Sequence, residues 1–160
     1  MRILRTIGVA LSAITLAAAA QAAGTVTVSF VKPENFTDVK DRYLSPDRHL
    51  EALKRHLEQA AAPYVADGQT LKIEVLDVDL AGEVNPSVRA NDLRVLKGSA
   101  DWPRIQLRYA LESPGQATRS GEARVQDMAY LMHRAHLPSG DALAYERRML
   151  DDWFKAEFRK

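Results

Sequence analysis

The segment Leu71–Leu80 is the feature of the sequence that most constrains the fold. Its apolar residues alternate with polar ones, as in a strand that buries one face, but the alternation changes phase between Val75 and Leu76. A strand can change phase in this way through a β-bulge, or by passing from burial on one face to burial on both. The segment is therefore expected to be a strand that either contains a β-bulge or becomes buried on both faces.

One strand and one helix are expected before this segment. Residues 25–31 alternate apolar and small polar residues, which predicts a strand that ends at Pro33. Ser45-Pro46-Asp47 provides an N-cap hydroxyl, a proline at the first helical position and an acid near the positive end of the helix dipole. A helix over residues 46–62 should follow, with one apolar stripe that faces a sheet. The stripe contains Leu50, Leu53, Leu57, Ala60 and Ala61.

A hairpin is expected after this segment. Residues 92–96 are a candidate short edge strand, and residues 105–111 alternate apolar and polar side chains before a turn at Pro114-Gly115. A two-residue loop would place Leu107 opposite Glu122, whereas a shift by one residue pairs the apolar faces of the two strands. The hairpin loop should therefore contain an odd number of residues.

A last helix is expected after an N-cap at Ser139. Its apolar stripe is predicted along Ala142, Tyr145, Met149, Trp153 and Ala156, flanked by Leu150, Phe154 and Phe158. The residues predicted to face outward are Glu146, Arg147, Arg148, Asp151 and Asp152. Together the elements predict an α+β fold, a two-layer sandwich in which two helices cover one face of an antiparallel or mixed sheet of four to five strands.

Residues 1–22 have the pattern of a secretory signal peptide. A positive leader at Arg2 and Arg5 precedes an uncharged apolar run, and Ala20-Gln21-Ala22 has small residues at the two positions that a signal peptidase reads. The mature chain is thus expected to start at Ala23, to form a single α+β domain over residues 23–160, and to lie in the periplasm or be secreted. It contains no second apolar run long enough to span a membrane.

Composition excludes several classes of function. The chain has no cysteine, which excludes disulfides, thiolate catalysis and cysteine-ligated zinc. It has 22 Lys and Arg residues and 21 Asp and Glu residues, so loss of Arg2 and Arg5 with the leader leaves a net charge of −1. A nearly neutral domain lacks the basic surface of a nucleic-acid-binding protein. The sequence also has no nucleotide-binding glycine loop and no serine-nucleophile motif, so no cofactor is expected.

Four segments together resemble a bacterial family known as domain of unknown function 3016. They are Val26–Pro33, Ile73–Glu83, Asp101–Ile105 and Tyr145–Phe154. The resemblance covers nearly all of the mature chain. It implies a small exported protein without an assigned activity, and it supplies no catalytic residues.

Asp77 and Asp79, with Glu83, are the candidates for a metal site. Residues i and i+2 of a strand point the same way, and two close carboxylates can hold calcium or magnesium, or separate their pKa values for acid–base chemistry. The alternative is a strand end that reaches solvent, where each aspartate bonds to loop amides or to an arginine. The spacing matches no EF-hand, and the prediction is that backbone amides or an arginine compensate both carboxylates without a metal.

Asp101, Trp102 and Arg104 are the candidates for a ligand or partner surface. A tryptophan next to an arginine in a loop before a strand suits a sugar, a peptide or a protein partner. The alternative is a tryptophan that folds over the end of the sheet. The histidines give weaker signals, because His49 and His56 are too far apart for one metal ion and His133 and His136 lack a third ligand.

The leading hypothesis is a non-enzymatic periplasmic binding or envelope-interaction domain. One alternative is a metal-dependent hydrolase, or a module that binds divalent cations, using Asp77 and Asp79. The other is an accessory subunit that docks on another envelope protein through the loops around Trp102.

Overall fold

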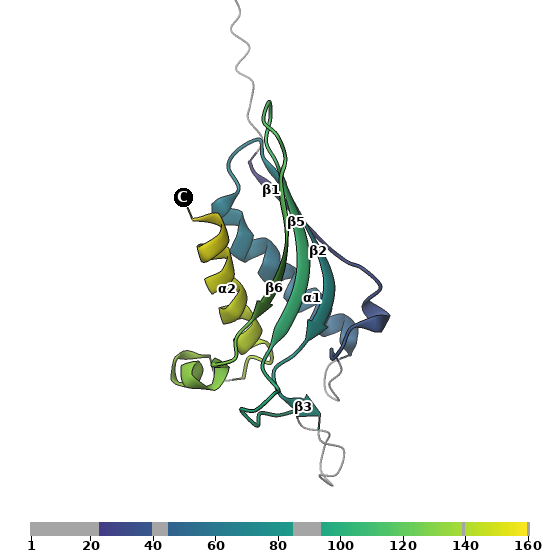
Figure 1. The fold of residues 1–160 in the computed structure, drawn as a ribbon, viewed down its shortest axis with the longest axis vertical. Helices are drawn as coiled ribbons and strands as arrows, with labels where there is room; N and C mark the ends of the chain where they lie inside the picture. Colours follow the sequence, from purple (N-terminus) through teal and green to yellow (C-terminus); the bar gives the residue numbers. More distant parts are fainter. Residues whose placement is uncertain (1–22, 40–44, 85–93, 139, 160) are drawn as a thin grey trace, which may run out of the picture.

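The computed structural model describes residues 23–39, 45–84, 94–138 and 140–159 (Figure 1). The strands are β1 (Thr25–Phe30), β2 (Thr70–Asp79), β3 (Glu83–Val84), β4 (Arg94–Val95), β5 (Arg104–Glu112) and β6 (Arg119–Gln126). The α-helices are α1 (Pro46–Ala61) and α2 (Ala144–Phe158), and the 3-10 helices are η1 (Pro33–Asn35), η2 (Ala62–Tyr64) and η3 (Tyr130–His136). The expected signal peptide and residues 92–93 of the expected edge strand lie outside the described residues.

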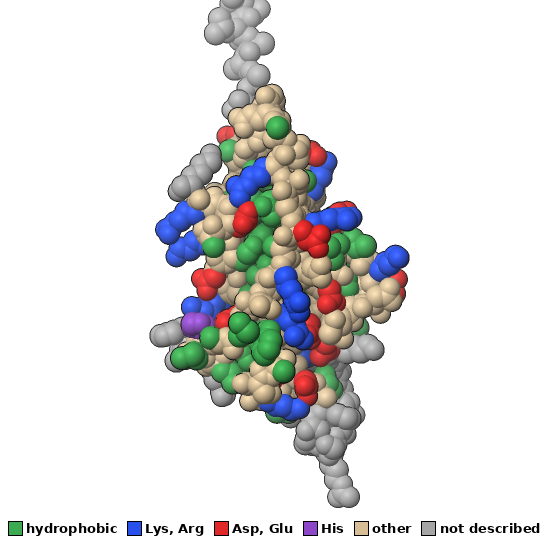
Figure 2. Space-filling model, viewed as in Figure 1, with side chains coloured by type: hydrophobic (Ala, Val, Ile, Leu, Met, Phe, Trp, Pro, Cys, Tyr) green, Lys and Arg blue, Asp and Glu red, His purple; other side chains and the backbone are tan. Residues whose placement is uncertain are grey.

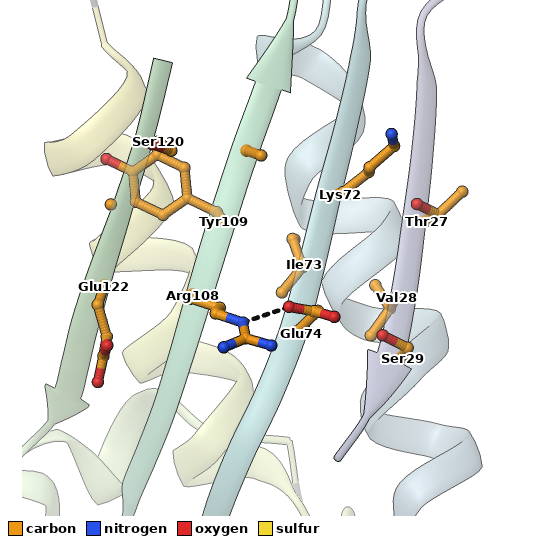
Figure 3. Close-up of a pocket in the computed structure, with 12 residues that line it drawn as sticks. Thr27, Val28, Ser29, Lys72, Ile73, Glu74, Arg108, Tyr109, Ser120 and Glu122 are labelled. Atoms are coloured by element: carbon orange, nitrogen blue, oxygen red, sulfur yellow. Dashed lines mark hydrogen bonds and ion pairs between the residues drawn. The ribbon is translucent and has the colours of Figure 1, made fainter. Parts of the chain in front are cut away.

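The main sheet has four strands in the order β1-β2-β5-β6. β1 and β2 are parallel and are joined through α1, whereas β2, β5 and β6 form antiparallel pairs. β3 and β4 form a separate two-stranded sheet beyond the end of β2. Both α-helices lie behind the same face of the main sheet (Figure 3). The predicted α+β class is confirmed, with a mixed sheet. In the described ranges, no helix is both long and apolar enough to cross a bilayer.

The change of phase in β2 is a β-bulge. Val75 pairs with Leu107 and Asp77 pairs with Gln106, so Leu76 is an extra residue on β2. The bulge lets the apolar residues before and after it face the same core, because the extra residue moves the alternation by one position. Residues on both sides of the bulge, such as Val75 and Val78, are fully buried.

The inner face of the sheet and the two helices enclose one core. Its most buried members include Leu53, Leu57, Leu71, Ile73, Ile105, Leu107, Leu150 and Phe154. The predicted stripe of α1 is confirmed for its three leucines and Ala61, and Ala60 packs at the margin. The Ser45 hydroxyl makes no capping hydrogen bond; the Ser45 carbonyl accepts one from the backbone N–H of Arg48 instead.

The β5–β6 hairpin has the register expected from its apolar faces. Leu107 pairs with Ala123 and Tyr109 pairs with Gly121, which leaves an odd number of residues in the loop. A Cβ on Gly121 would lie 2.8 Å from the Tyr109 hydroxyl, so the missing side chain makes room for the tyrosine ring.

The last helix differs from the prediction in its start and in its buried face. Its first residue is Ala144, and the Asp141 carboxylate accepts a hydrogen bond from the Leu143 N–H in the preceding turn. The predicted cap, Ser139, lies outside the described residues. The buried stripe runs through Glu146, Met149, Leu150, Phe154 and Phe158, while Ala142 and Ala156 are exposed. The expectation that Glu146 faces outward was wrong.

Candidate functional site

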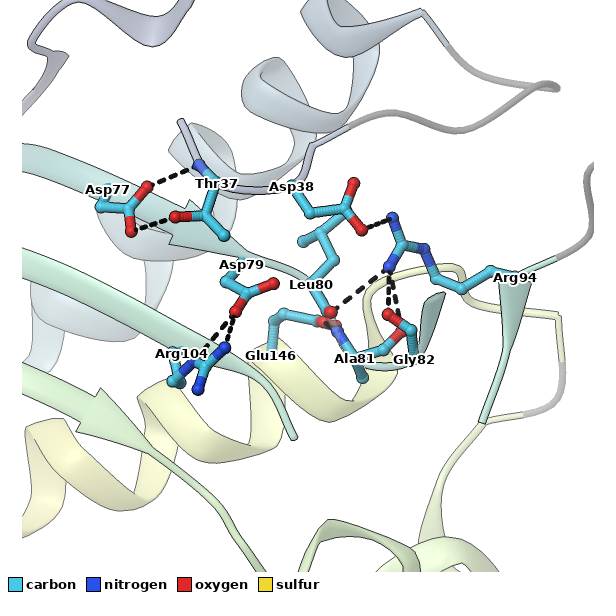
Figure 4. Close-up of polar contacts among 10 residues, drawn as sticks. All are labelled: Thr37, Asp38, Asp77, Asp79, Leu80, Ala81, Gly82, Arg94, Arg104 and Glu146. Carbon is cyan, nitrogen blue, oxygen red and sulfur yellow. Dashed lines mark hydrogen bonds and ion pairs between the residues drawn. The ribbon is translucent and has the colours of Figure 1, made fainter. Parts of the chain in front are cut away.

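Asp77 and Asp79 lie on the outer face of the sheet, which the helices leave open. Asp77 accepts hydrogen bonds from the Thr37 backbone N–H at 2.7 Å and from the Thr37 hydroxyl at 2.8 Å. Asp79 pairs with Arg104, whose Nε lies 2.9 Å from the carboxylate (Figure 4). One carboxylate is thus bonded to a backbone amide and the other to an arginine, which is the compensation that the sequence predicts.

The three candidate metal ligands do not form one cluster of acids. Glu83 lies on β3 and pairs with Lys97 rather than turning toward Asp77 or Asp79. Within the described residues, no group of three or more His, Asp or Glu side chains is arranged to hold a metal ion.

Asp101 stabilises its own loop. Its side chain is buried and accepts hydrogen bonds from the backbone N–H groups of Lys97, at 2.6 Å, and Ser99, at 2.9 Å. Burial by itself would raise the pKa of Asp101, but these bonds and one from the Tyr130 hydroxyl together lower it. Burial also raises the pKa of Tyr130, to about 12.

Trp102 is half-buried beside this loop, and its ring lies under a cation. The guanidinium carbon of Arg104 is 5.5 Å from the ring centroid, within the range of a cation–π contact. The indole Nε1 is buried and has no hydrogen-bond partner among the residues described. Arg104 therefore links Trp102 to Asp79, and the two candidate groups from the sequence meet at this one arginine.

A polar cluster that the sequence did not indicate lies next to these residues. Glu146, on the first turn of α2, is 1% exposed, and its Oε1 accepts a hydrogen bond from the Ala81 N–H at 2.7 Å. Its Oε2 is buried and has no partner in the described part of the chain. Burial raises the pKa of Glu146, although the Ala81 hydrogen bond and the charge of Arg94 act in the opposite direction.

Arg94 holds the same turn from the other side. Its guanidinium donates to the carbonyl oxygens of Leu80, Ala81 and Gly82, at 2.7 Å for Gly82, and lies 3.0 Å from the Asp38 carboxylate (Figure 4). Together Arg94 and Glu146 bind the three residues that follow β2, so the turn that leads to β3 is fixed to both β4 and α2.

The outer face of the sheet contains a hollow of about 610 Å³ (Figure 3). Small side chains form its floor, because Ala110 on β5 pairs with Ser120 on β6. The polar side chains around the floor are Thr27, Ser29, Lys72, Glu74, Arg108 and Glu122. The hollow is therefore a shallow basin bordered by charged side chains from β2, β5 and β6 and by hydroxyl groups from β1.

Ion pairs hold the charged rim of the basin in place. Arg108 pairs with Glu74 directly across β5 and β2, and Lys72 Nζ lies 2.6 Å from the Glu112 carboxylate. Gln106 donates to Glu122 at 2.7 Å. Both members of the first two pairs are at least 42% exposed, so they can exchange these partners for those of a ligand.

An apolar patch lies beyond the end of β6. Met132, on η3, is 82% exposed and Met128, just before it, is 66% exposed; they are the two exposed large hydrophobic residues within the described ranges. Hydrophobic side chains gather over this region, below the open sheet (Figure 2). A hollow of about 350 Å³ between β6 and α2 lies nearby, with Met149 and Trp153 among its lining residues.

His49 and His56 have structural roles. His49 is 3% exposed and lies with the core residues of α1. His56 Nε2 lies 3.1 Å from the Arg147 carbonyl oxygen and 3.0 Å from the Asp151 carboxylate, so it joins α1 to α2. His133 lines the hollow between β6 and α2.

The family model for a protein of unknown function, DUF3016, matches residues 24–156. The chain belongs to the DUF3016 family. The matched range covers every strand and all but the end of α2, so the open face and the polar cluster are parts of the DUF3016 domain. Searches for similar curated proteins and for similar solved structures found no match.

Proposed function

We propose that this DUF3016 protein is an exported, non-enzymatic domain that binds a polar ligand of the bacterial envelope on the open face of its sheet. The observation that carries the proposal is the basin on that face. The helices cover only one side of the four-stranded sheet, so the other side is available for contact. Ligand sites are usually hollows with a small number of polar groups in fixed positions.

The chemistry of the rim sets the class of ligand. Arg108 and Lys72 offer cationic donors, Glu74 and Glu122 offer anionic acceptors, and Thr27, Ser29 and Ser120 offer hydroxyl groups. A ligand with ammonium and carboxylate groups, such as a short peptide, can replace both halves of the Arg108–Glu74 pair at once. An uncharged sugar would leave these charges with each other and gain only hydroxyl contacts.

The metal-site alternative draws no support from the strand end. Asp77 and Asp79 already have partners in Thr37 and Arg104. A cation at this position would have to displace an arginine from one carboxylate and a backbone amide from the other.

Titration of the isotope-labelled chain over residues 23–160 with charged tripeptides tests the proposal. We expect saturable amide shifts confined to outer-face positions of β2, β5 and β6, and no shifts with a neutral disaccharide. Arg108→Ala should abolish them. The matched control is Arg148→Ala on α2, which lies on the opposite layer and should bind like the wild type. Shifts that persist in Arg108→Ala, or that map to the helices, would contradict the assignment of the basin.

The export part of the proposal has its own test. It rests on the apolar run and the Ala20-Gln21-Ala22 pattern. Amino-terminal sequencing of the protein recovered from the periplasm should begin at Ala23. Full-length chain retained in the inner membrane would exclude a cleaved signal.

A further inference from the structure

β6 is an edge strand with an open hydrogen-bonding side. It is the last strand in the order β1-β2-β5-β6, and in the described part of the chain nothing pairs with its other edge. It runs for eight residues, and its outer-face side chains Ser120, Glu122, Arg124 and Gln126 are all exposed. An edge of this length presents a row of unpaired N–H and C=O groups that another strand can join.

Ala123 lies between two residues of opposite charge on β6, Glu122 before it and Arg124 after it. In an antiparallel pairing of two β6 strands centred on this residue, Glu122 of each copy lies opposite Arg124 of the other. Ser120 lies opposite Gln126, and Gly121 opposite Val125, so polar residues meet on the outer face and small or apolar residues on the inner face. Such a self-complementary strand fits a two-fold contact between identical subunits.

The neighbouring registers are worse. A pairing centred on Glu122 places that residue opposite its own copy, and a pairing centred on Arg124 does the same with two arginines. Like charges directly opposite each other destabilise a strand pair. A shift by one residue places the inner face of one copy beside the outer face of the other. Of these registers, only the one centred on Ala123 places opposite charges opposite each other and keeps the inner faces of the two copies on the same side.

The current partners of the two charged residues fit this contact. The Arg124 side chain is exposed and makes no hydrogen bond or ion pair among the described residues. The Glu122 carboxylate accepts one hydrogen bond from the neutral amide of Gln106, and Arg108, which lies opposite it on β5, forms its ion pair with Glu74. The proposed pairing supplies Arg124 with an opposite charge at a directly opposed cross-strand position, and it gives Glu122 a second one besides Arg108.

We infer that two copies of this chain associate through antiparallel pairing of their β6 strands centred on Ala123. The pairing extends the sheet of one copy into that of the other, with the helices of both on the same side. The two open faces then form one continuous surface, and Ser120 and Glu122, which line the basin, lie at its centre. The inference is independent of whether the basin binds a peptide.

A single introduced thiol tests the register, because the chain has no cysteine of its own. At the centre of the pairing the two copies of residue 123 are directly opposite, about 5 Å apart at Cα, which is within the range of a disulfide. Ala123→Cys should therefore form a covalent dimer under mild oxidation. Ser120→Cys is the control, because its two copies would be roughly 20 Å apart along the strands although the side chain is more exposed.

Charge exchange tests the ion pairs by sedimentation velocity over a range of concentrations. Glu122→Arg and Arg124→Glu should each weaken the dimer by about tenfold or more, since each converts two attractive pairs into two repulsive ones. The double variant with both exchanges restores opposite charges across the contact and should dimerise like the wild type. Added salt should weaken the wild-type dimer, because these pairs are exposed.

Three results would overturn the inference. One is a wild-type chain that remains monomeric at every concentration. Another is a dimer that neither single charge reversal affects, which would place the contact elsewhere. The third is cross-linking of Ser120→Cys as fast as Ala123→Cys, which would show random collision rather than a defined register.

Discussion

The inner face of the main sheet is covered by α1 and α2, whereas the outer face is open and has charged and hydroxyl side chains. Most inner residues of β2 and β5 are fully buried and belong to one core cluster, so a lost methyl group leaves a cavity. The outer residues pair mostly across neighbouring strands, as Arg108 does with Glu74 and Gln106 with Glu122. The difference means that stability depends mainly on one face, whereas residues on the other face can change without loss of the fold.

The largest expected effect comes from the inner face. Leu53→Ala should lower the free energy of unfolding by about 2–5 kcal/mol, because Leu53 is 1% exposed at the centre of the α1 stripe. His56→Ala, one turn along, should cost only about 1 kcal/mol through its bonds to α2. Urea melts of both variants measure the difference. Similar losses would mean that α1 depends on its polar edge as much as on its leucines.

Glu146 is the polar exception on the covered side, and its effect depends on pH. Because burial raises its folded-state pKa above the ordinary value of 4.5, the folded protein binds more protons than the unfolded chain between these two values. The free energy of unfolding should therefore fall as the pH rises through that window. The charge of Arg94 lowers the pKa of Glu146 and reduces this effect, whereas the charge of Asp141 raises the pKa and increases it. Glu146→Gln keeps the acceptor for Ala81 and does not titrate, so it should be more stable than the wild type above the window.

Urea midpoints of Glu146→Gln and of the wild type across the acidic range provide the measurement. The two curves should converge at low pH and separate as the pH rises. Equal slopes in both proteins would show that Glu146 stays ionised in the fold and that another group compensates it.

A smaller effect is expected at the strand end on the outer face. The Asp77→Asn and Asp79→Asn double variant should fold and lose about 1–2 kcal/mol, because asparagine can still accept from the Thr37 N–H while the Arg104 pair is weakened. Calcium, magnesium, manganese and zinc should not shift the wild-type melting temperature. A saturable shift with one cation that disappears in the double variant would make this strand end a metal site.

The smallest effect on stability is expected from the rim of the basin. Arg108→Ala should leave the urea midpoint unchanged, because Arg108 and Glu74 are both well exposed and exposed ion pairs add little to stability. The same variant should lose the peptide-induced shifts on the outer face. A clear fall in the midpoint would mean that the pair serves the fold, and that the two faces are not separate in function.

The sequence predicted the features that depend on residues close together along the chain or on the pairing of two strands. The alternation in β2 and β5 and the odd hairpin loop follow from side-chain period and register, and the bulge near Leu76 was one of the two alternatives that the change of phase allowed. The partners of Asp77 and Asp79 were predicted as types, an amide and an arginine, though not as Thr37 and Arg104. These predictions succeed because a strand has only two faces and a carboxylate needs compensation.

Features built from distant segments could not be predicted. Glu146 is charged, so a local helical pattern places it in solvent; only the unpaired N–H of Ala81, 65 residues earlier, explains its burial. The basin exists because small residues on β5 and β6 lie between long ones on three strands. A sequence pattern gives the size of each side chain but not which side chains become neighbours across a sheet.

The bulge in β2 has a consequence for how the length of this chain can vary. Without Leu76 the sequence would read as an unbroken alternation from Leu71 to Leu80, and every residue beyond the bulge would keep its present partner on β5. A one-residue deletion inside a central strand normally exchanges its two faces and destroys the core. Here deletion of Leu76 would make the pairing of β2 with β5 regular and would only straighten the sheet. Leu76 can therefore be lost without loss of the core, and its presence bends the surface on which the basin lies.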